Sequence, residues 1–115
     1  MYLKGLKGDF TDLMGEYTMQ CQKNNGYPVY MKERPGNKEA VFLHRTNIGT
    51  WMVSKKNGMS EDMGWIASCE AADLPSKAGL TWEYYNSAKS SDWIPSDNTR
   101  LRALNLSTRR RSDWA

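Results

Sequence analysis

The chain has no long apolar run, only one histidine and only two cysteines among its 115 residues. A helix that spans a membrane needs about 20 apolar residues in a row, so no membrane span is expected. Cys21, Cys69 and His44 are too few to form a structural zinc site, which takes four such ligands. The cysteines leave two alternatives open: a disulfide between them, or two separate buried thiols.

Sequence motifs for catalysis are also lacking. The chain has no nucleophile elbow, zinc motif or phosphate-binding loop. His44 lies inside an aromatic segment, where a structural role is the ordinary one. Glu61 with Asp62, and Asp92 with Asp97, offer carboxylates for glycoside hydrolysis or calcium binding, but they fall in polar stretches and match no EF-hand spacing. We therefore expect no enzymatic activity, no cofactor and no metal.

The positive charge is concentrated at one end of the chain. Three of the 16 basic residues are Arg109, Arg110 and Arg111, and one of the 13 acidic residues is Asp113, so residues 105–115 carry a net charge of +2 and residues 1–104 carry +1. A nucleic-acid surface needs clustered positive charge on the fold itself. The distribution therefore argues against specific nucleic-acid binding and predicts a basic tail that attracts acidic partners in a salt-dependent way.

Short β-prone segments separated by turn-forming residues are plentiful. The predicted strands span residues 16–22, 27–33, 39–45, 50–54, 64–69, 81–85 and 100–106. Asn25-Gly26 and Arg34–Asn37 are strong turn signals, and Gly26 is expected at positive φ. Pro28 predicts an edge or a bulge. The pattern predicts an all-β fold: a single small, twisted antiparallel meander or open barrel of roughly five to seven strands.

The strand alternation also predicts the domain bounds and the core. Residues 1–14 are expected to be a lead-in segment with at most one helical turn, 15–106 the antiparallel β domain, and 107–115 a flexible basic tail. The residues in the apolar phase, expected to be buried, are Tyr17, Val29, Leu43, Trp51, Val53, Trp65 and Ile66.

Surface aromatic residues are the main functional signal. Tyr30 and Tyr85 each follow a core-facing neighbour in their predicted strands, and Trp82 lies where the strand rhythm changes. Exposed aromatic rings stack on sugar faces or contact a peptide. Tyr30, Trp82 and Tyr85 are therefore the candidate ligand-binding residues, although Trp82 also fits a role in closing the core.

The series Gly-x-Tyr from Gly15, Asn-Gly-x-Pro-Val-Tyr from Asn25, Gly-x-Trp from Gly49 and Gly-Trp-Ile from Gly64 resembles a small module. Modules of this kind occur in large, poorly characterised proteins of algae, protists and marine invertebrates. The resemblance covers about residues 13–104, without the cysteines or the arginine-rich tail. It implies a β fold and a non-catalytic role, with no mechanism.

Together these observations predict a non-catalytic interaction module that binds another protein. The alternative is a carbohydrate-binding module that uses the surface tyrosine and tryptophan rings. We expect a monomer or one module of a longer chain. If Met1 is the native start, the lack of an apolar signal-peptide core predicts a cytoplasmic protein. For an excised domain the location stays open.

Overall fold

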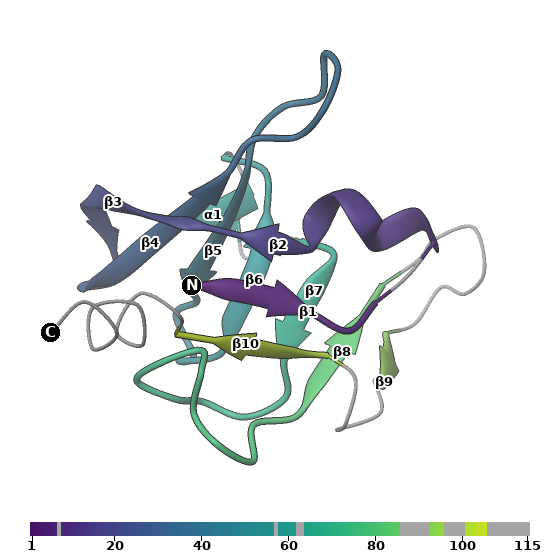
Figure 1. Cartoon of the computed structure of the whole chain (residues 1–115). Helices are drawn as coiled ribbons and strands as arrows, with labels where there is room; N and C mark the ends of the chain where they lie inside the picture. The colour runs from purple at the N-terminus through teal and green to yellow at the C-terminus, as the bar shows by residue number, and fades with distance from the viewer. Residues whose placement is uncertain (7, 57, 62–63, 86–92, 96–100, 106–115) are drawn as a thin grey trace, which may run out of the picture.

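The computed structural model describes residues 1–6, 8–56, 58–61, 64–85, 93–95 and 101–105 (Figure 1). Its strands form two antiparallel sheets: seven strands in the order β3-β4-β5-β6-β7-β8-β9, and three in the order β10-β1-β2. The large sheet contains β3 (Thr18–Asn24), β4 (Tyr27–Lys32), β5 (Val41–Arg45), β6 (Trp51–Ser54), β7 (Ile66–Ser68), β8 (Trp82–Tyr84) and β9 (Ile94–Pro95). The small sheet contains β1 (Tyr2–Lys4), β2 (Gly15–Glu16) and β10 (Arg102–Leu104). The all-β meander prediction is confirmed, and among the described residues neither sheet closes into a barrel.

The first hairpin of the meander has the predicted turn. Asn25 and Gly26 have φ values of 53° and 79°, which are the left-handed conformations of a two-residue hairpin loop. The β3–β4 ladder then shifts register between Met19 and Lys23, the partner of Pro28. Proline has no N–H to donate, so the irregularity lies where the sequence predicts a bulge.

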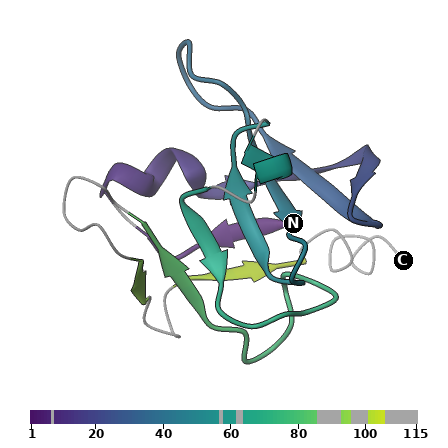
Figure 2. The ribbon, with the colours of Figure 1, turned by 180° about the vertical axis from the view of Figure 1, so that it is seen from behind.

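The central strands are buried on both faces. The main core lies between the two sheets and takes one face of β4 to β7, with Tyr30 opposite Leu43 and Val53 opposite Ile66. On the other face, the short helix α1 (Gly58–Glu61) lies over the large sheet (Figure 2), and Gly64 approaches Met52 and Val53 closely. This double cover explains why β6 is buried at every position.

Six of the seven predicted core residues are buried, and Trp65 is the exception. Its ring is only partly buried and packs at the margin of the core. The Arg34 guanidinium lies over it, 5.4 Å from the ring centroid. Trp65 is therefore shielded by a cationic side chain from the β4–β5 loop instead of by the second sheet.

The N-terminal segment, described over residues 1–6 and 8–13, is part of the packed fold. β1 pairs with β2 on one side and with β10 on the other, and a 3₁₀ helix, η1 (Gly8–Leu13), follows β1. Leu3, Phe10 and Leu13 are buried in the core. The predicted lead-in segment thus supplies the middle strand of the small sheet, and the predicted final strand pairs with it and not with the meander.

Both alternatives for the cysteines are wrong. Cys21 and Cys69 are free thiols, and both are exposed. Cys21 shares a predicted face with Tyr17, but β3 extends beyond the core, so Met19 is also 60% exposed. Among the described residues, no helix is long and apolar enough to cross a membrane.

Candidate protein-binding surface

The aromatic residues predicted to bind a ligand do not form one exposed platform. Tyr30 and Trp82 are only 4% and 2% exposed. Period-two alternation placed Tyr30 opposite a buried Val29, but both faces of β4 are covered at this point, and the Tyr30 ring packs on Trp51 with centroids 6.2 Å apart. The prediction that Tyr30 lies on the surface is therefore wrong, and the burial of Trp82 agrees with the alternative that this ring closes the core.

Tyr85 follows directly after β8. Its ring is half-buried, and its centroid is 5.8 Å from that of Trp93. Its backbone N–H donates to the carbonyl of Trp65 at 2.8 Å. Arg109, Arg110 and Arg111, the predicted basic tail, lie outside the described residues.

His44 is fully buried, as its position in an aromatic strand suggests. Its Nε2 lies 2.8 Å from Ser54 Oγ, and Ser54 Oγ donates to the carbonyl of Lys55 at 2.9 Å. Because a hydroxyl has one proton, a Ser54 that donates to Lys55 accepts from His44 only in the Nε2–H tautomer. A nucleophile–base pair needs the other tautomer, in which Nε2 accepts the serine proton. The described residues also contain no group of three side chains suited to hold a metal.

Three connections of the meander meet at one end of the large sheet, at the lower left in Figure 1. They are the β3–β4 turn, the β5–β6 turn, and the longer connection from β7 to β8. We call this region the loop-end surface. It consists of Tyr27, Arg45, Ile48, Ala71, Asp73 and Leu74.

Arg45, at the end of β5, joins all three connections. Its carbonyl accepts hydrogen bonds from the side-chain amides of Asn24 and Asn25, at 3.1 and 2.9 Å. Its guanidinium lies over the Tyr27 ring, 3.9 Å from the centroid, and its Nε donates to the carbonyl of Ala72 at 3.0 Å. One residue therefore links the first turn to the third connection through a cation–π contact and a hydrogen bond.

The β5–β6 turn is fixed against the third connection by its backbone. The Gly49 carbonyl accepts from Ala72 N–H at 3.1 Å, and the Ala72 carbonyl also accepts from Trp51 Nε1 at 2.9 Å. Within the turn, Gly49 N–H donates to the carbonyl of Thr46 at 3.1 Å, with Gly49 at φ 90°. A Cβ at Gly49 would lie 3.0 Å from both the Ala71 Cβ and Arg45 Nη2. Only glycine fits this close approach without displacing its neighbours.

Two aliphatic side chains project from this fixed scaffold. Ile48 is 79% exposed and Leu74 is 47% exposed. Ile48 lies between Asn47 and Gly49, in a tight turn where polar residues are usual. The turn does not need a β-branched apolar residue, and the fold does not bury it. The Asn-Ile-Gly sequence is therefore a local signal for a candidate binding residue, and the strand pattern did not point to it.

Comparison with known proteins gives no homologue to guide the assignment: no family model, curated protein or solved structure matches this chain. The resemblance to a module of large algal, protist and invertebrate proteins stays a prediction. The function must therefore be argued from the geometry of the chain itself.

Proposed function

We propose that this protein is a non-catalytic module that binds another protein through the loop-end surface. The observation that carries the proposal is the pair of exposed aliphatic side chains, Ile48 and Leu74, on connections that hydrogen bonds hold together. Scattered apolar surface residues are normal. Two such residues on hydrogen-bonded tight turns are not, because turns are usually polar.

The rigidity of the scaffold supports a binding role. Association loses free energy when loops and side chains must be ordered, and a surface that is already ordered avoids that loss. Here Arg45 and the Ala72 backbone connect the three turns before any partner arrives. Tyr27 and Arg45 are also of the residue types that dominate the binding energy of protein interfaces.

The protruding shape of the loop-end surface indicates that the recess of the interface lies on the partner. Ile48 stands at the tip of a hairpin turn and is more exposed than Met19 or Leu74. A protruding aliphatic side chain is buried by entering a recess in the partner. Full burial of such a side chain is worth about 1.5–3 kcal/mol, which makes Ile48 the expected centre of the interface.

A display library of random peptides on phage tests the proposal. We expect peptides selected on the immobilised native chain to bind at least about tenfold more weakly to Ile48→Asp and to Leu74→Asp, because a charge would enter the apolar contact. Met19→Asp is the matched control, since Met19 is also an exposed apolar residue but lies on β3. Peptides that bind the Ile48 and Leu74 variants as well as the native chain would contradict the proposal.

Two of the three rings on which the carbohydrate-binding alternative depends, those of Tyr30 and Trp82, are buried and cannot stack on a sugar. Tyr85 remains half-buried beside Trp93. A glycan array checks this alternative directly: a protein-binding module should retain no sugar. Glycan binding that Tyr85→Ala abolishes and Ile48→Asp leaves unchanged would favour the alternative.

A further inference from the structure

Asp73 in the loop-end surface and Glu70 next to it accept hydrogen bonds from neutral donors. Both carboxylate oxygens of Glu70 accept from Thr81, from its N–H at 2.9 Å and from its hydroxyl at 2.5 Å. The hydroxyl bond from Thr81 holds the pKa of Glu70 below its usual value. Asp73 accepts from the Tyr27 hydroxyl at 3.3 Å. Neither carboxylate forms an ion pair with Arg45 among the described residues.

The guanidinium of Arg45 is fixed in place, and some of its N–H groups are not used by the described hydrogen bonds. One face lies on the Tyr27 ring, and Nε donates to the carbonyl of Ala72. A guanidinium has five N–H donors in a planar fork. The described hydrogen bonds of this half-buried side chain use only Nε. The two Nη atoms, of which Nη2 lies beside Gly49, are therefore the donors for a two-bond contact with a carboxylate.

The same region carries further positive charge. Lys23 lies at the exposed end of β3 and Lys77 in the β7–β8 connection, and neither forms an ion pair with a described residue. The charge of Lys77 also helps to lower the pKa of the Glu70 carboxyl. Arg45 is the cation that a hydrogen bond and a ring contact fix in place, and it adjoins the turn that bears Ile48.

We infer that the partner of the loop-end surface presents a carboxylate beside an apolar contact, and that Arg45 binds this carboxylate. The inference rests on the proposed function and adds the chemistry of the partner: an acidic–apolar protein segment. The apolar contact takes Ile48 and Leu74, and the acidic side chain lies against the Nη edge of Arg45. Planar, two-bond recognition explains why an arginine stacked on a tyrosine ring suits this position better than a lysine would.

The phage-selected peptides test the inference. We expect them to carry Asp or Glu close to an apolar residue. A synthetic copy of the strongest peptide should bind about tenfold more weakly after Arg45→Gln, as for the loss of a charged hydrogen-bonded pair. Lys38→Gln, at the opposite end of the sheet, is the control and should leave the affinity for the peptide unchanged.

Because Arg45→Gln also disturbs the scaffold, the peptide is varied in parallel. Replacing its acidic residue by the amide should cause the same loss with the native chain, and no further loss with Arg45→Gln. Acid-free peptides that bind and still depend on Ile48 would overturn the carboxylate inference and leave the proposed function intact. Peptides that bind the Ile48→Asp and Leu74→Asp variants as tightly as the native chain would contradict the proposed function itself. A library that yields no binder would also contradict it.

Discussion

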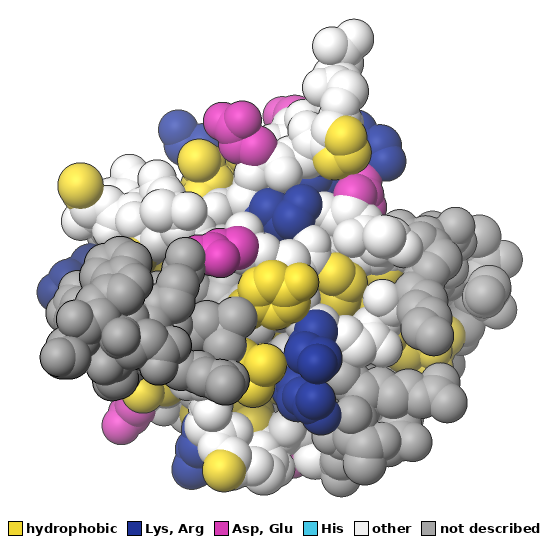
Figure 3. All heavy atoms as spheres, in the orientation of Figure 1, with side chains coloured by type: hydrophobic (Ala, Val, Ile, Leu, Met, Phe, Trp, Pro, Cys, Tyr) yellow, Lys and Arg dark blue, Asp and Glu magenta, His cyan; other side chains and the backbone are white. Residues whose placement is uncertain are grey.

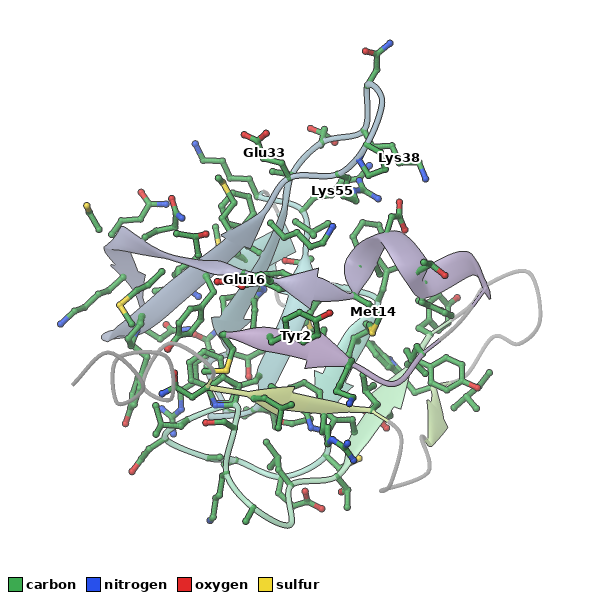
Figure 4. The ribbon with its side chains drawn as sticks, viewed as in Figure 1. Tyr2, Met14, Glu16, Glu33, Lys38 and Lys55 are labelled. Carbon is green, nitrogen blue, oxygen red and sulfur yellow. The ribbon has the colours of Figure 1, made fainter. Side chains whose placement is uncertain are left out.

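The two ends of the large sheet differ in how their connections are stabilised. At the loop-end surface, neutral hydrogen bonds and one cation–π contact hold turns that expose aliphatic side chains. At the other end, the long β4–β5 loop, at the top of Figure 1, is held by charge: Lys38 Nζ is 2.8 Å from Asp12 on η1, and Lys55 Nζ is 3.3 Å from Glu39. Side chains of both signs surround this loop in Figure 3, and Figure 4 labels Glu33, Lys38 and Lys55 there.

The comparison separates residues that the fold explains from residues that it does not. Arg34 and Lys38 of the β4–β5 loop pair with Asp12 on η1, and Glu39 pairs with Lys55, which follows β6. Arg34 also donates from Nε to the carbonyl of Glu39 at 2.7 Å. Their arrangement follows from holding a long loop in place. Ile48 and Leu74 stay 79% and 47% exposed, so packing within the described residues covers little of Ile48 and about half of Leu74. This contrast supports the proposal of a binding surface at this end.

The largest expected effect on stability comes from replacing Trp51, beneath the loop-end surface, and is compared with the effect of replacing Trp65, which lies against Arg34 of the β4–β5 loop. Trp51→Ala should lower the free energy of unfolding by about 3–5 kcal/mol, because it leaves a cavity in the core and removes the bond to Ala72. Trp65→Ala should lower it by about 1–2 kcal/mol, since that ring is only partly buried. Urea unfolding of both variants measures the difference. Equal losses would mean that Trp51 has no special role beneath the loop-end surface.

The next effect concerns two glycines at positive φ, one at each end. Gly49→Ala should cost about 2–4 kcal/mol, because the added Cβ meets the Ala71 Cβ and Arg45 Nη2. Gly36→Ala, in the β4–β5 loop, should cost about 1 kcal/mol, since its φ is 72° but nothing lies within 4 Å of the added Cβ. Both variants carry the strain of a positive φ, but only the Gly49 variant also has close neighbours. The difference between the two melting curves therefore measures the cost of the close contacts. A Gly49 variant as stable as the Gly36 variant would show that the turn is not held tightly.

A smaller effect tests the charged end through pH. The hydrogen bond from Lys38 holds the pKa of Asp12 below 3.8, its ordinary value. The stabilisation from the Asp12–Lys38 pair is therefore fully present above the pKa of Asp12 in the unfolded chain. It is lost as the pH falls through the lower pKa of Asp12 in the folded chain. Asp12→Asn should cost about 0.5–1 kcal/mol at neutral pH, and this deficit should shrink below about pH 4. Thermal unfolding at several pH values checks the trend, and a deficit that stays constant down to pH 2 would refute the charge-based account.

Much of the meander could be predicted because its signals are local. Asn25-Gly26 specifies a hairpin turn whatever surrounds it, and Pro28 marks an irregular ladder in any sheet. The face on which Tyr30 lies could not be predicted, because the cover over each side of β4 comes from distant segments. Alternation tells which residues share a face but not whether the second face is also buried.

The candidate site was harder to predict for a similar reason. Arg45, Tyr27 and Ala72 are far apart in sequence and meet only after the strands have paired. The aromatic residues drew attention because aromatic rings are common in binding sites, yet Trp82 and Tyr30 serve the core. Ile48 was the one local signal, an aliphatic residue between two turn formers.

The smallest expected change in stability gives the most direct test of the central claim, that the loop-end surface exists to bind a protein. Since Ile48 is 79% exposed, Ile48→Asp should change the free energy of unfolding by less than about 0.5 kcal/mol. The same variant should lose at least about tenfold in affinity for the phage-selected peptide, measured by titration calorimetry beside Met19→Asp. Unchanged stability with lost binding is the predicted result. Unchanged affinity in a folded Ile48→Asp variant would contradict the account.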